Sequence, residues 1–150
     1  MSQAIADGFH SHIDEAERRL RALPEQDSLL RTRPDGWTRK QVLGHLIDSA
    51  LNNHQRVVRA SLQGEYRGPG YDQDGWVRMH GYEELPWTEL VDFWTSQNRL
   101  LARVVSRIPA DRLEAPCQVG EHPAMTLLAL IEDYLRHMRQ HLDQIRAEGV

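Results

Sequence analysis

The sequence has a single cysteine, Cys117, and no run of about 18 apolar residues. One cysteine cannot form an internal disulfide, and it excludes zinc clusters built from cysteine ligands. The chain also shows no positively charged leader followed by an apolar segment, so we expect neither a membrane span nor a secretory signal. These absences predict a cytoplasmic protein in which any metal is bound by nitrogen and oxygen atoms.

The chain also has no concentrated positive charge. Its formal net charge is −4, its arginines are scattered, and Lys40 is its only lysine. A protein that follows a phosphate backbone needs a basic stripe, so we do not expect a nucleic-acid partner. The composition is 40% hydrophobic and 27% charged, which is typical of a globular protein. A length of 150 residues predicts one domain, residues 1–150, with a full hydrophobic core.

Strand-like alternation, internal repeats and low-complexity segments are absent as well. Instead, apolar residues recur at spacings of three and four, which is the signature of amphipathic helices. The segments with this period are 3–23, 38–63, 88–108 and about 126–147. This pattern predicts an all-α protein, a four-helix bundle with long connecting loops. All three connectors exceed ten residues, so a simple up-and-down order does not follow.

The start of the second predicted helix carries clear local signals. Pro34-Asp35-Gly36 is a turn sequence, and Thr38 can cap the helix with its hydroxyl group. Gln41, three residues later, completes a capping box. On this helix the period places His45 on the polar side and His54 in the apolar arc. His45 is therefore either exposed, with His54 in the core, or the lining of a covered cavity. Periodicity favours the first alternative.

The connector 64–87 has five glycines and two prolines and shows no helical period. Such a long segment without secondary structure is often a functional loop or lid, although a solvated connector is the alternative. Tyr71, Asp72, Asp74 and Trp76 give it aromatic and ionisable groups, and we expect His80 to be incidental.

The last predicted helix contains His137 and His141, one turn apart. Both rings can therefore point at a single ion between helices. His45, far upstream, is the candidate third ligand.

The stretch DGWTRKQVLGHLIDSALNNHQRVVRASLQGE, then GYDQDGWV and YLRHMRQHLDQI, resembles the DinB-like (DinB/YfiT-like) four-helix-bundle metalloenzyme family. The resemblance covers residues from about 34 to 146. It implies a divalent cation held by His45, His137 and His141, which overturns the preference for an exposed His45. It also implies a homodimer.

Three imidazoles leave open coordination positions on Zn²⁺, Ni²⁺, Fe²⁺ or Mn²⁺, as catalytic sites do. The resemblance implies an enzyme that either transfers a low-molecular-weight thiol to electrophiles or hydrolyses a small-molecule substrate. The alternatives are a metal- or ligand-binding stress-response module without turnover, and a dimeric helical scaffold. Asp48 and Asp133 are within reach to orient the rings, or are ordinary surface acids. No residue is identified as a general base. The predicted substrate-binding residues are Asn52, Arg56, Tyr71, Asp72, Asp74 and Trp76, with Arg56 a candidate to bind a substrate carboxylate.

Overall fold

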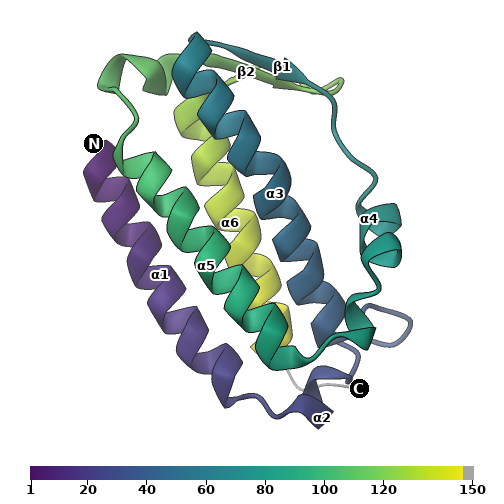
Figure 1. Cartoon of the computed structure of the whole chain (residues 1–150). Helices are drawn as coiled ribbons and strands as arrows, with labels where there is room; N and C mark the ends of the chain where they lie inside the picture. Colours follow the sequence, from purple (N-terminus) through teal and green to yellow (C-terminus); the bar gives the residue numbers. More distant parts are fainter. Residues whose placement is uncertain (147–150) are drawn as a thin grey trace.

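The computed structural model describes residues 1–146, and it confirms the prediction of an all-α bundle. Four long helices make up the bundle (Figure 1). They are α1 (Ser2–Ala22), α3 (Arg39–Gln63), α5 (Trp87–Ser106) and α6 (Leu127–Arg146). Their bounds agree closely with the predicted segments, and the predicted end near residue 147 lies outside the described residues. No helix within residues 1–146 is long and apolar enough to cross a membrane.

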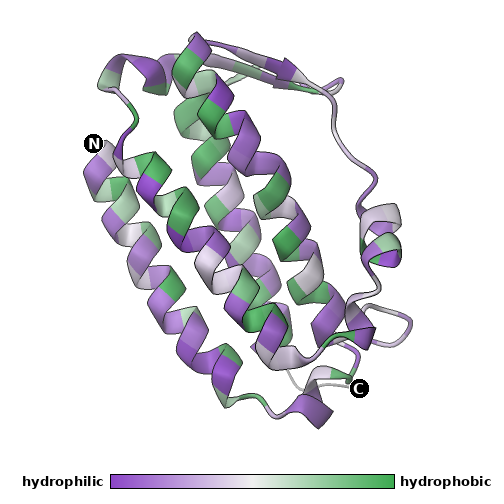
Figure 2. Ribbon diagram, viewed as in Figure 1, coloured by the Kyte–Doolittle hydropathy of each residue, from purple (hydrophilic) through white to green (hydrophobic). Residues whose placement is uncertain are grey.

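The core lies along the axis between the four helices. Each long helix alternates hydrophobic and hydrophilic residues along its length (Figure 2), because only one face is turned toward its neighbours. The largest side chains with almost no exposed surface come from all four helices, and burial of each one stabilises the fold by about 1.5–3 kcal/mol. They include Phe9, Ile13, Leu43, Leu46, Trp87, Trp94, Leu101, Leu127 and Met138.

The predicted capping box fixes the start of α3. The Oγ1 atom of Thr38 accepts a hydrogen bond from the backbone N–H of Gln41 at 3.2 Å. In return, Gln41 Oε1 accepts the backbone N–H of Thr38 at 2.9 Å. Gly64 then ends α3 in the left-handed conformation, at φ 82°. The phase of α3, and with it the direction in which His45 points, is therefore set from both ends.

The connector between α3 and α5 contains more structure than its sequence predicts. It forms β1 (Tyr66–Gly68), α4 (Gln73–His80) and a 3-10 turn, η1 (Tyr82–Glu84). Asp72 caps α4 by accepting the N–H of Gly75, and Gly81 ends it at φ 59°. A helix of eight residues is too short to show a clear period, which is why periodicity missed it. The connector returns along the outside of α3, so α3 and α5 run parallel (Figure 1).

A small sheet at one end of the bundle also escaped prediction, because strands of two to four residues show no alternation. It pairs β1 in parallel with β2 (Pro116–Val119), and β2 antiparallel with β3 (Met125–Thr126). The remaining short elements are α2 (Glu25–Ser28) and η2 (Ala110–Glu114). The sheet joins the connectors that follow α3 and α5, and α2 lies at the opposite end of the bundle (Figure 1).

Candidate metal centre

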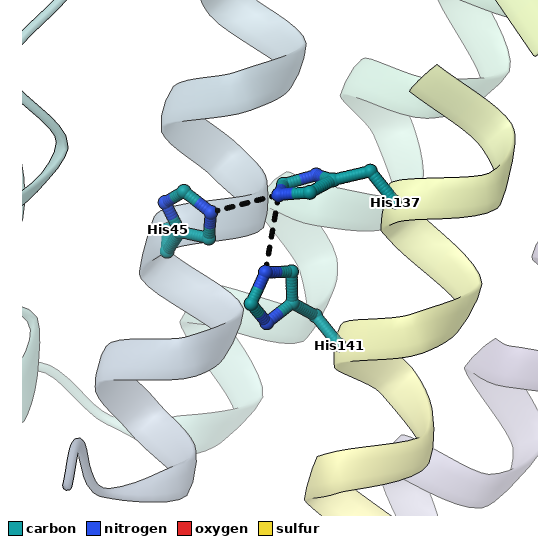
Figure 3. A group of neighbouring side chains, drawn as sticks. All are labelled: His45, His137 and His141. Atoms are coloured by element: carbon teal, nitrogen blue, oxygen red, sulfur yellow. Dashed lines mark hydrogen bonds between the residues drawn. The ribbon is translucent and has the colours of Figure 1, made fainter. Parts of the chain in front are cut away.

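Three histidine rings from two helices meet between α3 and α6 (Figure 3). The Nε2 atom of His137 lies 3.2 Å from Nε2 of His45 and 3.1 Å from Nε2 of His141. The ligand atoms of all three lie within 4.8 Å of one another, close enough for one metal ion. A tetrahedral zinc site with Zn–N bonds of about 2.0–2.1 Å separates its nitrogens by roughly 3.3 Å. The spacing of the rings thus suits a single cation.

The surroundings of His45 and His137 favour the neutral ring, which is the form that binds metals. His45 is only 1% exposed, and burial, followed by repulsion from His141 and His137, lowers its pKa to about 3. Burial also lowers the pKa of His137, with a further contribution from His141. Each neutral imidazole carries one N–H, so the three Nε2 atoms cannot satisfy one another fully by hydrogen bonds.

The outer nitrogen of His141 has a definite partner. Its Nδ1 atom lies 3.0 Å from Oε1 of Gln144. An amide oxygen only accepts, so this contact places the proton on Nδ1 and leaves a lone pair on Nε2, directed at the other rings. The donor set therefore fits a cation. Sequence reasoning did not identify Gln144, although its position one turn after His141 is a detectable signal.

The two acids expected near the histidines make other contacts. Asp48 is fully buried, but its Oδ1 atom accepts the hydroxyl of Tyr82 at 2.6 Å and lies 2.9 Å from Nδ1 of His80. Asp133 is exposed and pairs with Arg136. Within residues 1–146, Nδ1 of His45 is buried without a hydrogen-bond partner. Neither acid forms a hydrogen bond to a ring of the triad. Of the two alternatives, Asp133 therefore fits the exposed surface acid, whereas the buried Asp48 fits neither.

The glycine that precedes His45 has a physical role. A Cβ atom on Gly44 would lie 2.0 Å from Cδ2 of Tyr82, so only glycine lets the tyrosine ring pack against α3 at this point. Tyr82 and His80 then both contact Asp48, which anchors the end of the connector beside the histidines. His80, which the sequence suggests is incidental, thus belongs to this anchor.

The periodicity of α3 gave the wrong preference between its two histidines. His45 is buried, whereas His54 is partly exposed. The ring of Trp37, which precedes the capping residue, covers His45 with ring centroids 5.1 Å apart and an interplanar angle of 40°. Helical period reports only the average direction of a face, and it cannot show that a loop residue covers the polar side.

A cavity of about 850 Å³ lies next to His137. Of the predicted substrate-binding residues, Arg56 and Tyr71 line it. The 119–125 loop, which sequence reasoning missed, forms its other wall. The full lining is Ser49, Asn53, Arg56, Gly70, Tyr71, Gln73, residues 119–125, Leu130, Asp133, Tyr134 and His137.

The other four predicted substrate-binding residues lie elsewhere. Asn52 donates its side-chain N–H to the backbone oxygen of Asp48, and Asp72 caps α4. Trp76 packs against Tyr71, with ring centroids 5.2 Å apart. Asp74 lines a separate hollow of about 240 Å³, which also contains His141. Asp74 thus shares a hollow with a ring of the triad, whereas the connector lines the large cavity through Gly70, Tyr71 and Gln73.

Comparisons with known proteins identify a matching family and a matching fold. The sequence model of the DinB superfamily matches residues 9–145. A protein of Halalkalibacterium halodurans, named as a candidate metal-dependent hydrolase, is 24% identical over 114 residues, which cover 76% of this chain. The match spans 66% of that relative, just under two thirds of its length.

Among solved structures, YfiT from Bacillus subtilis is described as a probable metal-dependent hydrolase with an unusual four-helix bundle topology. It matches with a TM-score of 0.82 and 16% identity, over 94% of this chain and 83% of that one. At this identity the likeness establishes the shared four-helix bundle fold.

Proposed function

Because the chain belongs to the DinB superfamily, we propose that it is a metal-dependent hydrolase whose divalent cation is held by His45, His137 and His141. The observation that carries the proposal is the convergence of three Nε2 atoms, from α3 and α6, beside a cavity large enough for a small molecule. The Halalkalibacterium halodurans relative is named as a candidate metal-dependent hydrolase, which supports the choice of reaction.

Three protein ligands leave coordination positions open, which distinguishes a catalytic metal site from a closed structural one. When bound, a divalent cation acts as a Lewis acid toward a carbonyl group and promotes the ionisation of water near neutral pH. Nitrogen ligands suit Zn²⁺, Ni²⁺ and Fe²⁺, and Mn²⁺ is the remaining candidate.

The chain's own residues prepare this site in three ways. Burial keeps His45 neutral, so no proton competes for its Nε2 atom at neutral pH. Gln144 fixes the tautomer of His141. Tyr71 and the 119–125 loop line the cavity next to His137, where the substrate would bind.

The test pairs two histidines of the same helix. His45→Ala should lose the stoichiometric metal ion and reduce hydrolysis of a panel of esters and amides to the buffer background. His54→Ala, the matched control outside the triad, should keep both. Metal content is measured by mass spectrometry after loading with each of the four ions. Wild-type protein that holds no ion after loading, or a His45→Ala variant that keeps full activity, would contradict the proposal.

The same panel distinguishes hydrolysis from the other predicted chemistry. An open position on the ion could also bind a low-molecular-weight thiol as its thiolate. Each reaction is therefore run with and without glutathione, bacillithiol or mycothiol. Product that forms without a thiol supports the hydrolase. Product that forms only with a thiol, and contains it, would replace the hydrolase with a thiol transferase at the same residues.

A further inference from the structure

Arg56 places a buried positive charge in the wall of the cavity. The residue is only 6% exposed, and it lines the same cavity as the metal-ligand candidate His137. It follows His45 by eleven residues on α3, about 16 Å along the helix axis at 1.5 Å per residue. Helical side chains lean toward the N-terminus, so the guanidinium group lies nearer to the histidines than its backbone does.

The guanidinium group of Arg56 lacks an acidic partner. Its Nη2 atom donates to the backbone oxygen of Pro69 at 3.2 Å, and Nη1 makes only a long contact of 3.5 Å with Oδ1 of Asn53. No carboxylate within residues 1–146 forms an ion pair with it. A charge removed from water without a counter-ion is costly, so the fold maintains this arrangement at the expense of stability.

The rest of the cavity wall indicates how much negative charge the site would accept. Among the described residues that line the cavity, Arg56 is the one arginine and none is a lysine. The acids Glu121 and Asp133 are exposed. Burial, followed by the nearby Asp48, raises the pKa of Tyr71 to about 12, so its hydroxyl remains a hydrogen-bond donor. One guanidinium group matches a singly charged carboxylate better than a doubly charged phosphate.

We propose that Arg56 binds the carboxylate of the substrate, and that the substrate is an elongated molecule whose hydrolysable bond lies at the histidines. Only the position of the hydrolysable bond rests on the proposed function. The carboxylate site itself is a property of the cavity and exists without the metal. The separation of the two residues along α3 favours a substrate longer than acetate or a single small amino acid.

The experiment measures carboxylate binding to metal-free protein, so that a direct bond between carboxylate and metal does not contribute. Hexanoate is the probe, and hexanamide is its neutral control. Arg56→Met, which keeps the length of the side chain without the charge, should weaken hexanoate binding by about 10- to 100-fold and leave hexanamide nearly unchanged. Arg56→Lys should retain part of the affinity. Equal hexanoate affinity in wild type and Arg56→Met would overturn the inference, as would no hexanoate binding by the wild type.

The urea midpoint of unfolding gives a second measurement. If Arg56 had only a structural role, Arg56→Met would lower this midpoint, which is the opposite of the change expected here. In buffer without carboxylates, Arg56→Met should unfold at the same or a higher urea concentration than the wild type, because it removes an unpaired buried charge. Added hexanoate should raise the midpoint of the wild type only. A lower midpoint for Arg56→Met without hexanoate would show that the guanidinium group serves packing, and would count against the inference.

The two proposals fail separately. Hydrolysis that depends on His45, together with hexanoate binding that ignores Arg56, rejects only the carboxylate site. Hexanoate binding that depends on Arg56, in a protein that never holds a metal, rejects only the hydrolase. If both hold, rates toward monomethyl esters of dicarboxylic acids should exceed those toward the dimethyl esters, and Arg56→Met should remove the difference.

Discussion

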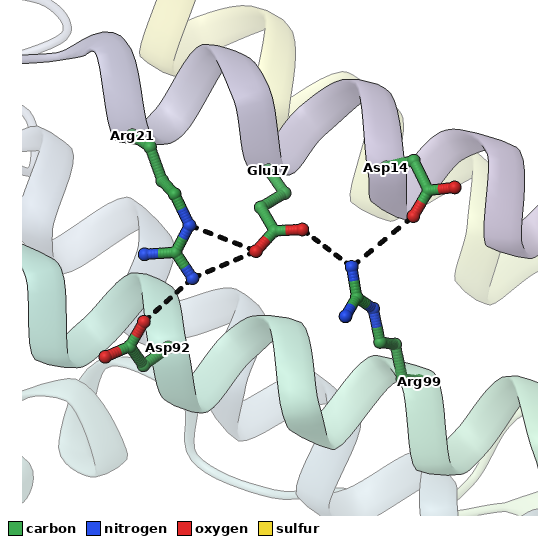
Figure 4. A network of polar contacts seen from close by, with 5 residues as sticks. All are labelled: Asp14, Glu17, Arg21, Asp92 and Arg99. Atoms are coloured by element: carbon green, nitrogen blue, oxygen red, sulfur yellow. Dashed lines mark hydrogen bonds and ion pairs between the residues drawn. The ribbon is translucent and has the colours of Figure 1, made fainter.

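Two helix pairs of the same bundle treat their polar groups in opposite ways. Between α1 and α5, charges of opposite sign meet at the surface, where Arg99 contacts Glu17 and Asp14, and Arg21 contacts Glu17 and Asp92 (Figure 4). Every group of that network has a counter-charge. Between α3 and α6, nitrogen faces nitrogen, and Arg56 nearby has no acid. The charged groups between α1 and α5 satisfy one another. The ring nitrogens between α3 and α6, and the guanidinium group of Arg56, are left able to bind a ligand.

The largest difference between the two pairs should appear on metal loading. An ion that binds only the folded state stabilises it by about 2.7 kcal/mol at a free concentration of 100 times Kd. Wild-type protein should therefore melt at a higher temperature with added Zn²⁺ than with a chelator, whereas His141→Ala should show no such shift. Arg99→Ala, in the α1–α5 network, should keep the full shift. Thermal unfolding by circular dichroism measures all three. If neither metal nor chelator changed the melting temperature of the wild type, the proposed difference between the two helix pairs would be contradicted.

Two glycines, one in each helix pair, provide the next test. Gly44→Ala should destabilise the protein by about 1–3 kcal/mol or more, because its Cβ would overlap the Tyr82 ring. Gly8→Ala on the exposed side of α1 meets no atom within 4 Å and should stabilise by about 0.5–1 kcal/mol, because alanine favours a helix more than glycine does. Urea unfolding gives both values. A Gly44→Ala variant as stable as the wild type would mean that the packing of Tyr82 on α3 is not as tight as described.

The smallest effect should come from the ion pairs themselves. The side chain of Arg99 is 49% exposed and that of Asp14 is 66% exposed, so solvent screens their attraction. Arg99→Ala should therefore change the free energy of unfolding by no more than about 1 kcal/mol, and about 1 M salt should remove most of that change. A loss of several kcal/mol that persists in high salt would show that this network contributes packing rather than charge.

The sequence predicted the long helices and the cap of α3 well. It predicted poorly which residues are covered by distant parts of the chain. The capping box of Thr38 and Gln41 is local, and it was correct because its atoms lie within one helical turn. His137 and His141 were paired for the same reason. His45 could be joined to them only through the family resemblance, because its burial depends on Trp37 and on packing against α6. The homodimer, the single domain and the cytoplasmic location stay predictions.

The loops show the same limit. Asp48 was a candidate to orient the histidines because it is close to His45 in sequence, yet its partners come from residues 80 and 82. The 119–125 wall of the cavity was not found at all, since its position depends on a parallel strand pair formed across a large sequence separation. Gln144 is different, because its spacing from His141 made it accessible to sequence reasoning.

The small sheet at the end of the bundle holds one wall of the cavity in place. The backbone N–H of Gly120 donates to the oxygen of Gly68 at 2.8 Å, so main-chain atoms hold the turn that walls the cavity against β1. Main-chain bonds do not depend on side-chain identity. Substitutions at residues 121–124 could therefore change which ligand the cavity prefers without moving the three imidazoles.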